Sequence, residues 1–177
     1  PGDSLPALLA RRILVAVGQH PPFTPAQEDA LGCFAEKFGA VVYTNHLSNY
    51  HGPNAVMASL LVENMDAKKF AEYAPELVIT IGGQIGEYGF DGMMRRIAAE
   101  HWSVTEDGAI HDTYGRLSKV FEFGHQELFR ALVERERGRV NDSYAERWSI
   151  ANAKRNIPAE LPLSHALVAA QLSPRIP

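Results

Sequence analysis

Three short and almost continuous apolar runs constrain the fold of this chain most strongly. They lie at residues 13–17, 41–44 and 77–81, and segments with helical spacing of apolar residues separate them. A short run that is apolar at nearly every position is typical of a strand buried on both faces, as in a parallel sheet covered by helices. The alternation therefore predicts an α/β fold with a parallel sheet between two helical layers.

Capping residues and apolar spacing predict the helices. Thr24 followed by Pro25 is typical of a helix start, and Gly39 of a helix end. The other predicted helices are residues 55–74 with a second helix that begins at Asp66, a helix capped by Asp91, residues 126–137 and residues 164–172. Residues 141–160 look polar and irregular, with Trp148 as a packing anchor.

Two further strands are predicted at residues 101–105 and 119–123, which gives a sheet of about five to six strands. Crossovers between the parallel strands should be right-handed. We predict the order 2-1-3-4-5, with the strands numbered along the chain. This is a three-layer, Rossmann-like arrangement. The carboxyl ends of the first and third strands then flank a topological switch point, where ligands bind preferentially.

Two loops at this switch point supply the candidate ligand contacts. These candidates are Gln19 and His20 in the first loop, and Gly82, Gly83, Gln84, Gly86, Glu87 and Tyr88 in the second. Glycines between a strand and a helix let the backbone approach an anion. The spacing is Gly-Gly-x-x-Gly rather than the dinucleotide-binding Gly-x-Gly-x-x-Gly, so a tight structural turn is an equal alternative for the second loop. A rigid Pro-Pro turn is the alternative for the first.

Composition excludes several classes of function. Lys and Arg number 17 against 21 Asp and Glu, and this net charge of −4 argues against nucleic acid as a partner. The longest apolar run is too short to span a membrane. The single cysteine, Cys33, excludes an intramolecular disulfide and a cysteine-based zinc site, and fits a reducing cytoplasm. We expect Cys33 to be a small core residue of its helix.

No complete active site is visible, so we assign no catalytic residue and no metal ligand. His46 and His51 share a loop without a third ligand nearby, and His101 is predicted to be structural. Glu106 and Asp107 allow acid–base chemistry, but a solvated Asp-Gly turn is the favoured interpretation. The residues alone indicate an α/β domain shaped for ligand binding.

Several stretches together resemble a known family. They are Glu76–Gly83, His101–Val104, the turn with Asp107, Gly108, Asp112, Arg116 and Leu117, and Lys119–His125. Over residues 10–150 the chain resembles the central domain of thiamine-diphosphate-dependent enzymes. Within that family it is most similar to the menaquinone-pathway synthases that add a succinyl-semialdehyde unit from 2-oxoglutarate to isochorismate. The resemblance implies a sheet of the DHS-like NAD/FAD-binding type.

The resemblance also implies a domain plan for a longer polypeptide, of which this chain would be a piece. Residues 1–10 would be a linker, residues 11–150 the central domain, and residues 151–177 a linker and the first helix of the following diphosphate-binding domain. Thiamine diphosphate and Mg²⁺ would be bound by the flanking domains, so we expect this chain alone to bind neither and to be inactive. Its partners would be the other domains and further copies in a homodimer or homotetramer.

One departure from the family bears on the substrate. Where the menaquinone-pathway synthases carry a basic pair, this chain has Gly86, Glu87 and Tyr88. A carboxylate-bearing acceptor would gain little from Glu87. The alternatives that stay open are another thiamine-diphosphate-dependent 2-oxo acid decarboxylase, a stand-alone nucleotide-binding α/β module, and a purely structural interaction domain.

Overall fold

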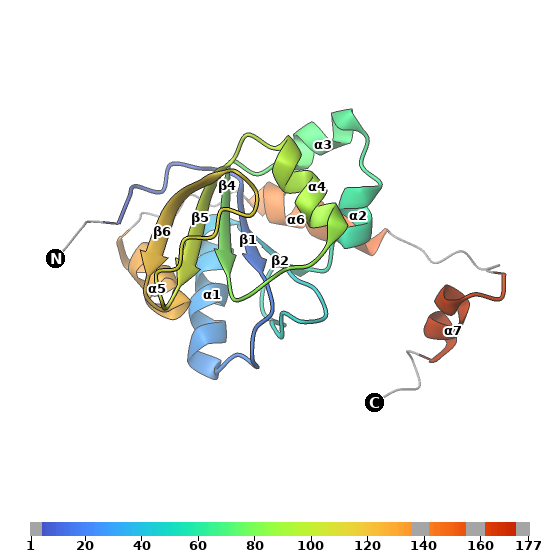
Figure 1. Cartoon of the computed structure of the whole chain (residues 1–177), viewed down its shortest axis with the longest axis horizontal. Helices are drawn as coiled ribbons and strands as arrows, with labels where there is room; N and C mark the ends of the chain where they lie inside the picture. Colours follow the sequence, from blue (N-terminus) through green and yellow to red (C-terminus); the bar gives the residue numbers. More distant parts are fainter. Residues whose placement is uncertain (1–4, 136–141, 155–161, 173–177) are drawn as a thin grey trace.

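The computed structural model describes residues 5–135, 142–154 and 162–172, and it contains a six-stranded sheet between two layers of helices (Figure 1). The strands are β1 (Ile13–Val17), β2 (Val41–Tyr43), β3 (Ala55–Val56), β4 (Leu77–Ile81), β5 (Glu100–Thr105) and β6 (Leu117–Glu122). Every pair is parallel, in the spatial order β3-β2-β1-β4-β5-β6. The predicted three-layer α/β fold is confirmed.

The five predicted strands keep their predicted order, and β3 is added at the edge beside β2. The prediction of a helix from residue 55 is wrong at its start, because Ala55 and Val56 pair with β2 instead. Helices α2 (Ser59–Glu63) and α3 (Ala67–Tyr73) follow. The predicted start at Asp66 is confirmed, since its carboxylate accepts a hydrogen bond from the backbone N–H of Lys69 at 2.8 Å.

The helices cover the sheet on both faces, and each face has its own apolar core. Helices α1 (Pro25–Phe38) and α5 (His125–Arg135) cover one face, where Phe34 and Phe129 pack on strand residues such as Ile79 and Trp102. Helices α2, α3, α4 (Tyr88–Arg96) and α6 (Asp142–Ala153) cover the other face. Successive residues of β1 alternate between the two cores, as the pleat of a strand requires.

The ends of α1 form as predicted. The Thr24 hydroxyl accepts from the backbone N–H of Gln27, and the Gln27 side chain accepts from the backbone N–H of Thr24. This capping box satisfies donors that lack partners inside the helix. At the other end Gly39 takes a left-handed φ of 59°. Cys33, however, is exposed rather than part of the core, because the buried stripe of α1 passes through Leu31, Phe34, Ala35 and Phe38.

Two other predictions require correction. Helix α4 begins at Tyr88 after Glu87, so Asp91 lies in its first turn and is not its cap. Residues 142–153 form helix α6 rather than an irregular segment, while residues 141 and 155–160 lie outside the described residues. Little in the sequence indicated this helix, because its apolar residues do not gather in one clear stripe. The predicted anchor is confirmed, since Trp148 is fully buried.

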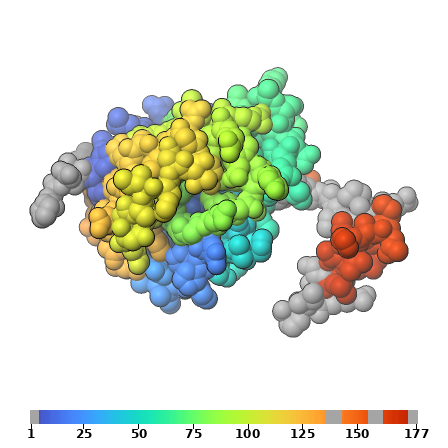
Figure 2. All heavy atoms as spheres, viewed as in Figure 1, coloured from blue at the N-terminus to red at the C-terminus, as the bar shows by residue number. Residues whose placement is uncertain are grey.

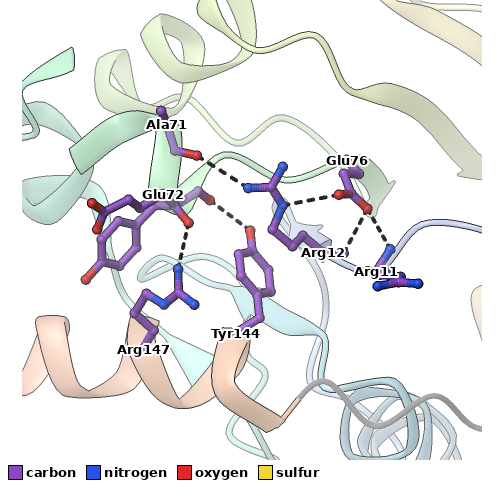
Figure 3. Close-up of polar contacts among 8 residues, drawn as sticks. Arg11, Arg12, Ala71, Glu72, Glu76, Tyr144 and Arg147 are labelled. Atoms are coloured by element: carbon purple, nitrogen blue, oxygen red, sulfur yellow. Dashed lines mark hydrogen bonds and ion pairs between the residues drawn. The ribbon is translucent and has the colours of Figure 1, made fainter. Parts of the chain in front are cut away.

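Polar contacts fasten α6 to the last turn of α3 (Figure 3). The Tyr144 hydroxyl donates to the carbonyl of Tyr73 at 2.9 Å, and the Arg147 guanidinium donates to the carbonyl of Glu72 at 3.1 Å. Beside them, Arg12 donates to the carbonyl of Ala71 and pairs with the Glu76 carboxylate. Helix α6 is therefore an integral part of the domain.

Helix α7 (His165–Leu172) confirms the helix predicted at residues 164–172. The Ser164 hydroxyl caps it by accepting from the backbone N–H of Leu167 at 3.3 Å. Among its described residues α7 buries no side chain. Each helix in the described part of the chain lacks the length and apolar character needed to cross a membrane.

Candidate functional site

The loops after β1 and β4, which carry the predicted ligand contacts, are bonded directly to each other. The N–H of Gly18 donates to the carbonyl of Ile81 at 3.0 Å, and the N–H of Gln19 donates to the carbonyl of Gln84 at 3.0 Å. In return the N–H of Gly83 donates to the carbonyl of Gln19 at 2.8 Å. The two loops therefore close the switch point between the strands with backbone.

Glycines at the switch point allow the backbones of the two loops to approach each other closely. A Cβ atom on Gly18 would lie 1.9 Å from the carbonyl oxygen of Gly83. A Cβ on Gly82, whose φ is +74°, would lie 2.8 Å from the carbonyl oxygen of Gln19. Gly86 also has a left-handed φ, of +66°, but a Cβ there would meet open space. The approach at Gly82 and Gly83 is thus toward the neighbouring loop.

Two polar side chains hold the loop after β2 against the same edge of the sheet. The sequence did not single them out individually. The Asn45 amide donates to the carbonyl of Ile85 at 2.7 Å, and the Ser48 hydroxyl donates to the carbonyl of Val17 at 2.6 Å. Both side chains are buried. The sequence pattern that could have indicated this role is a pair of polar residues soon after a buried strand, because backbone carbonyls at the sheet edge need hydrogen-bond donors there.

His20 stands in an aromatic cluster rather than alone. Its Nδ1 donates to the carbonyl of Pro21 at 2.6 Å, and its ring stacks on Phe23 at 4.1 Å. His125, at the start of α5, meets the ring of His20 edge-on at 5.0 Å. Gln19, Gly82, Gly83 and Gln84 are exposed beside this cluster. The edge of the sheet thus presents imidazole and amide groups to solvent.

Glu87 and Tyr88 point to different surroundings although they are neighbours. The Tyr43 hydroxyl, from β2, donates to the Glu87 carboxylate at 2.5 Å. Burial, followed by this contact with Glu87, raises the pKa of Tyr43 far above its usual value. Tyr88 is 93% exposed. Glu87 is therefore engaged in holding α4 to the sheet, and Tyr88 is free to meet another surface.

A cavity of about 330 Å³ opens beside the closed switch point, between the loops after β4 and β5. Figure 2 shows the surface hollowed in this region. Its walls include Thr80, His101, Ser103 and Tyr114. His101 is 2% exposed, and its Nε2 lies 3.0 Å from the Thr80 hydroxyl. Burial lowers the pKa of His101, and nearby Asp112 opposes this shift.

A second cavity, of about 420 Å³, lies on the other side of Gly82 and is lined by His20, Asp107, Phe123 and His125. Burial, followed by the neighbouring His20, lowers the pKa of His125 to about 4. A neutral imidazole is therefore the form present at pH 7. Neither cavity is lined by a lysine or arginine among the described residues. The edge suits hydrogen bonding more than the binding of phosphate groups.

The acidic turn after β5 is built as the solvated interpretation predicts. Glu106 and Asp107 are exposed, and the Asp107 carboxylate accepts from the backbone N–H of Ala109 at 3.0 Å. Gly108 has a φ of +64°. His46 and His51 are exposed in one loop. Within residues 5–135, 142–154 and 162–172, no three His, Cys, Asp or Glu side chains gather as metal ligands.

Comparison with known proteins gives a consistent set of relatives. The chain is 29% identical over 126 residues to a 2-succinyl-5-enolpyruvyl-6-hydroxy-3-cyclohexene-1-carboxylate synthase of Flavobacterium johnsoniae. Proteins with the same name from Bacteroides thetaiotaomicron and Phocaeicola vulgatus are 30% identical over 106 residues and 35% identical over 93 residues. No family model matches the chain.

The coverage of these alignments is unequal. They include 70%, 55% and 51% of this chain, but only 23%, 19% and 17% of the respective relatives. The chain thus spans about a fifth of the length of the curated relatives that it matches. Over half or more of its length, the chain resembles one segment of 2-succinyl-5-enolpyruvyl-6-hydroxy-3-cyclohexene-1-carboxylate synthases.

Proposed function

We propose that this chain is the central domain of a thiamine-diphosphate-dependent synthase of menaquinone biosynthesis. The complete enzyme would decarboxylate 2-oxoglutarate and add the succinyl-semialdehyde unit to isochorismate. One observation carries the proposal: four curated synthases of the same name are 27–35% identical to this chain, each over a segment of about a fifth of its length. The three-layer α/β fold is in keeping with this role.

In this proposal residues 11–150 are the central domain, residues 1–10 a linker, and residues 151–177 a linker and the first helix of the next domain. Two features support the plan. The cores on the two faces of the sheet take nearly all of their residues from Ile13 to Trp148, and Leu8 of the proposed linker also packs into one of them. Helix α7 buries no side chain of its own, as expected of a helix whose packing partners belong to another domain. Helix α6 continues past residue 150 to Ala153.

The proposal assigns the cofactor to the flanking domains. Thiamine diphosphate supplies an ylid that attacks a 2-oxo acid and stabilises the carbanion left when carbon dioxide departs. The described residues do not fit this group. The nearest motif is Asp107-Gly108, but Glu106 stands where the Gly-Asp-Gly motif has its first glycine, and the Asp107 carboxylate accepts a hydrogen bond within its own turn. In this proposal the chain alone binds neither the cofactor nor Mg²⁺, and is inactive.

The domain would act as a scaffold, with its loops at the edge of the active site. Its partners would be the other domains of the polypeptide and further copies in a homodimer or homotetramer. Leu60 of α2 and Tyr88 of α4 support such contacts, since they are 61% and 93% exposed and α2 packs against α4. Exposed apolar side chains on one face often mark a contact with another protein surface.

Another thiamine-diphosphate-dependent 2-oxo acid decarboxylase is a second candidate because of Glu87. The Glu87 carboxylate lies where the resemblance places a basic pair, and Tyr43 holds it within the domain. An acceptor with carboxylate groups gains no attraction from this position. The acceptor is therefore the part of the proposal that most needs testing.

The sequence of the parent gene tests the domain plan. We expect the reading frame to extend on both sides of this chain, with a glutamate-bearing pyrimidine domain before it and a Gly-Asp-Gly…Asn motif after it. A gene that encodes only these 177 residues would contradict the proposal. The nucleotide-binding module would then become the leading alternative.

A further inference from the structure

A groove far from the candidate loops combines an apolar floor with three cationic side chains. It has a volume of about 420 Å³ and lies between the α2–α3 segment and α6. Lys69, Arg147 and Lys154 line it. In the described part of the chain no carboxylate lines this groove. Three cationic side chains around one groove with no carboxylate in its lining create a positive potential that favours an anion.

The cations are available for a ligand. Figure 3 shows Arg147 donating to the carbonyl of Glu72, a bond of 3.1 Å that uses one of its five N–H donors. Lys69 bonds Asp66 only through its backbone N–H, so its ammonium group makes no ion pair among the described residues. The Lys154 ammonium likewise has no carboxylate partner in that part of the chain.

The floor of the groove is apolar and firmly packed. Met65 is 8% exposed, and Tyr73 packs edge-on against the buried Trp148 at 5.5 Å between ring centroids. Leu61, Ile150 and Ala151 complete the apolar lining, and Ile150 remains 45% exposed. Water gains little from contact with such a surface, so an apolar group that covers it is stabilised.

We propose that this groove binds a small anionic amphiphile, with a compact apolar body on the floor and a carboxylate or phosphate head among the three cations. The inference is independent of the proposed synthase, because none of the candidate loop residues lines the groove. If the groove binds no such ligand, the proposed synthase role is unaffected, and the reverse also holds. Both parts of the ligand are needed, since exposed charge pairs alone bind weakly.

A competition assay with the 177-residue chain tests the ligand class. The fluorescent sulfonate 1-anilinonaphthalene-8-sulfonate is bound first, and octanoate, octyl phosphate, octanol or acetate is then added. We expect octanoate or octyl phosphate to displace the probe, and the more effective of the two identifies the head group. Octanol lacks the charge and acetate lacks the chain, so we expect each to displace much less at the same concentration. Equal displacement by octanol, or none by either amphiphile, would overturn the proposal.

Substitutions locate the binding. The double variant Lys69→Ala and Lys154→Ala should weaken octanoate binding about fivefold or more, as expected for the loss of two exposed charge contacts. Lys68→Ala is the matched control, because Lys68 is an exposed lysine of the same helix that does not line the groove. It should change binding less than about twofold. Equal affinities for the double variant and the control would place the ligand elsewhere and refute the assignment.

Discussion

Gly18 and Gly83 stand in direct backbone contact at the switch point of the sheet. A Cβ atom on Gly18 would lie 1.9 Å from the carbonyl oxygen of Gly83, and three hydrogen bonds join the two loops around this contact. In an open α/β sheet this is the position where a ligand enters between diverging strands. Here the backbone fills it, and the cavities lie on either side.

Substitution of Gly18 by alanine should therefore be costly. The clash involves backbone on both sides, so it cannot be relieved by a side-chain rotation, and we expect a loss of about 3 kcal/mol in the free energy of unfolding. Gly92→Ala in α4 is the control, because a Cβ there meets no atom within 4 Å. It should stabilise the helix by about 0.5–1 kcal/mol. Urea unfolding followed by tryptophan fluorescence measures both, and equal effects would contradict this description of the switch point.

The bond between Tyr43 and Glu87 should contribute to stability. Removal of the hydroxyl in Tyr43→Phe leaves a half-buried carboxylate without its donor, at an expected cost of about 2 kcal/mol. Glu87→Gln keeps an acceptor and should cost less than about 1 kcal/mol. Tyr50→Phe is the matched control, because Tyr50 donates to the neutral carbonyl of Pro53. Equal losses of stability in the two phenylalanine variants would show that the bond from Tyr43 to Glu87 contributes no more than the bond from Tyr50 to a neutral carbonyl.

Stability should fall in mild acid because of His125. Burial lowers its pKa in the folded state from 6.5 to about 4, so the unfolded state binds more protons between these values. The free energy of unfolding therefore decreases as pH falls through this window, by up to about 3 kcal/mol at about 1.4 kcal/mol for each pKa unit. Among its neighbours, His20 lowers this pKa further and Glu127 raises it.

The variant His125→Leu isolates this contribution. Below pH 6.5 its stability should decline less steeply than that of the unsubstituted chain, although His101, whose pKa is also lowered, keeps a part of the slope. Equilibrium unfolding at pH 7 and pH 4.5 gives the comparison. Parallel decline of the two proteins would show that His125 is not the group responsible.

Nucleotides should not stabilise the chain. The two cavities at the sheet edge offer no lysine or arginine among the described residues, and the carboxylate of Glu87 sits at the amino end of α4, where it disfavours a phosphate. A ligand at 100 times its dissociation constant adds about 2.7 kcal/mol, which raises the melting temperature by several degrees. We expect 1 mM ADP or FAD to shift it by less than about 1 °C. A shift of several degrees would favour the nucleotide-binding module.

Much of the fold is predictable because burial imposes a visible pattern. Leu77–Ile81 is covered on both faces, so its residues are apolar at every position but Thr80, and this pattern predicts the strand. Thr24 and Gly39 mark the ends of α1 because capping depends on neighbouring residues alone. The order of the five main strands is that of a doubly wound sheet, in which strands are added on both sides of the first strand.

The predictions that proved wrong concern elements whose formation depends on contacts with residues distant in the sequence. Ala55 and Val56 form a strand only because β2 offers them an open edge. Helix α6 exists through contacts of Tyr144 and Trp148 with the second core, which its own sequence does not display. The same limit applies at the candidate site. Gly82 and Gly83 were equally compatible with a ligand cradle or a turn, and only the position of the β1 loop shows what they approach.

Release of carbon dioxide by the full-length enzyme would show whether this chain is a domain of the proposed synthase. The purified product of the parent gene is supplied with thiamine diphosphate, Mg²⁺ and 2-oxoglutarate labelled at its first carbon, with and without isochorismate. If the chain belongs to such a synthase, labelled carbon dioxide beyond one equivalent per active site, and the product that the curated relatives are named for, should form only when isochorismate is present. Repeated turnover without isochorismate, or activity that does not depend on thiamine diphosphate, would contradict the proposal.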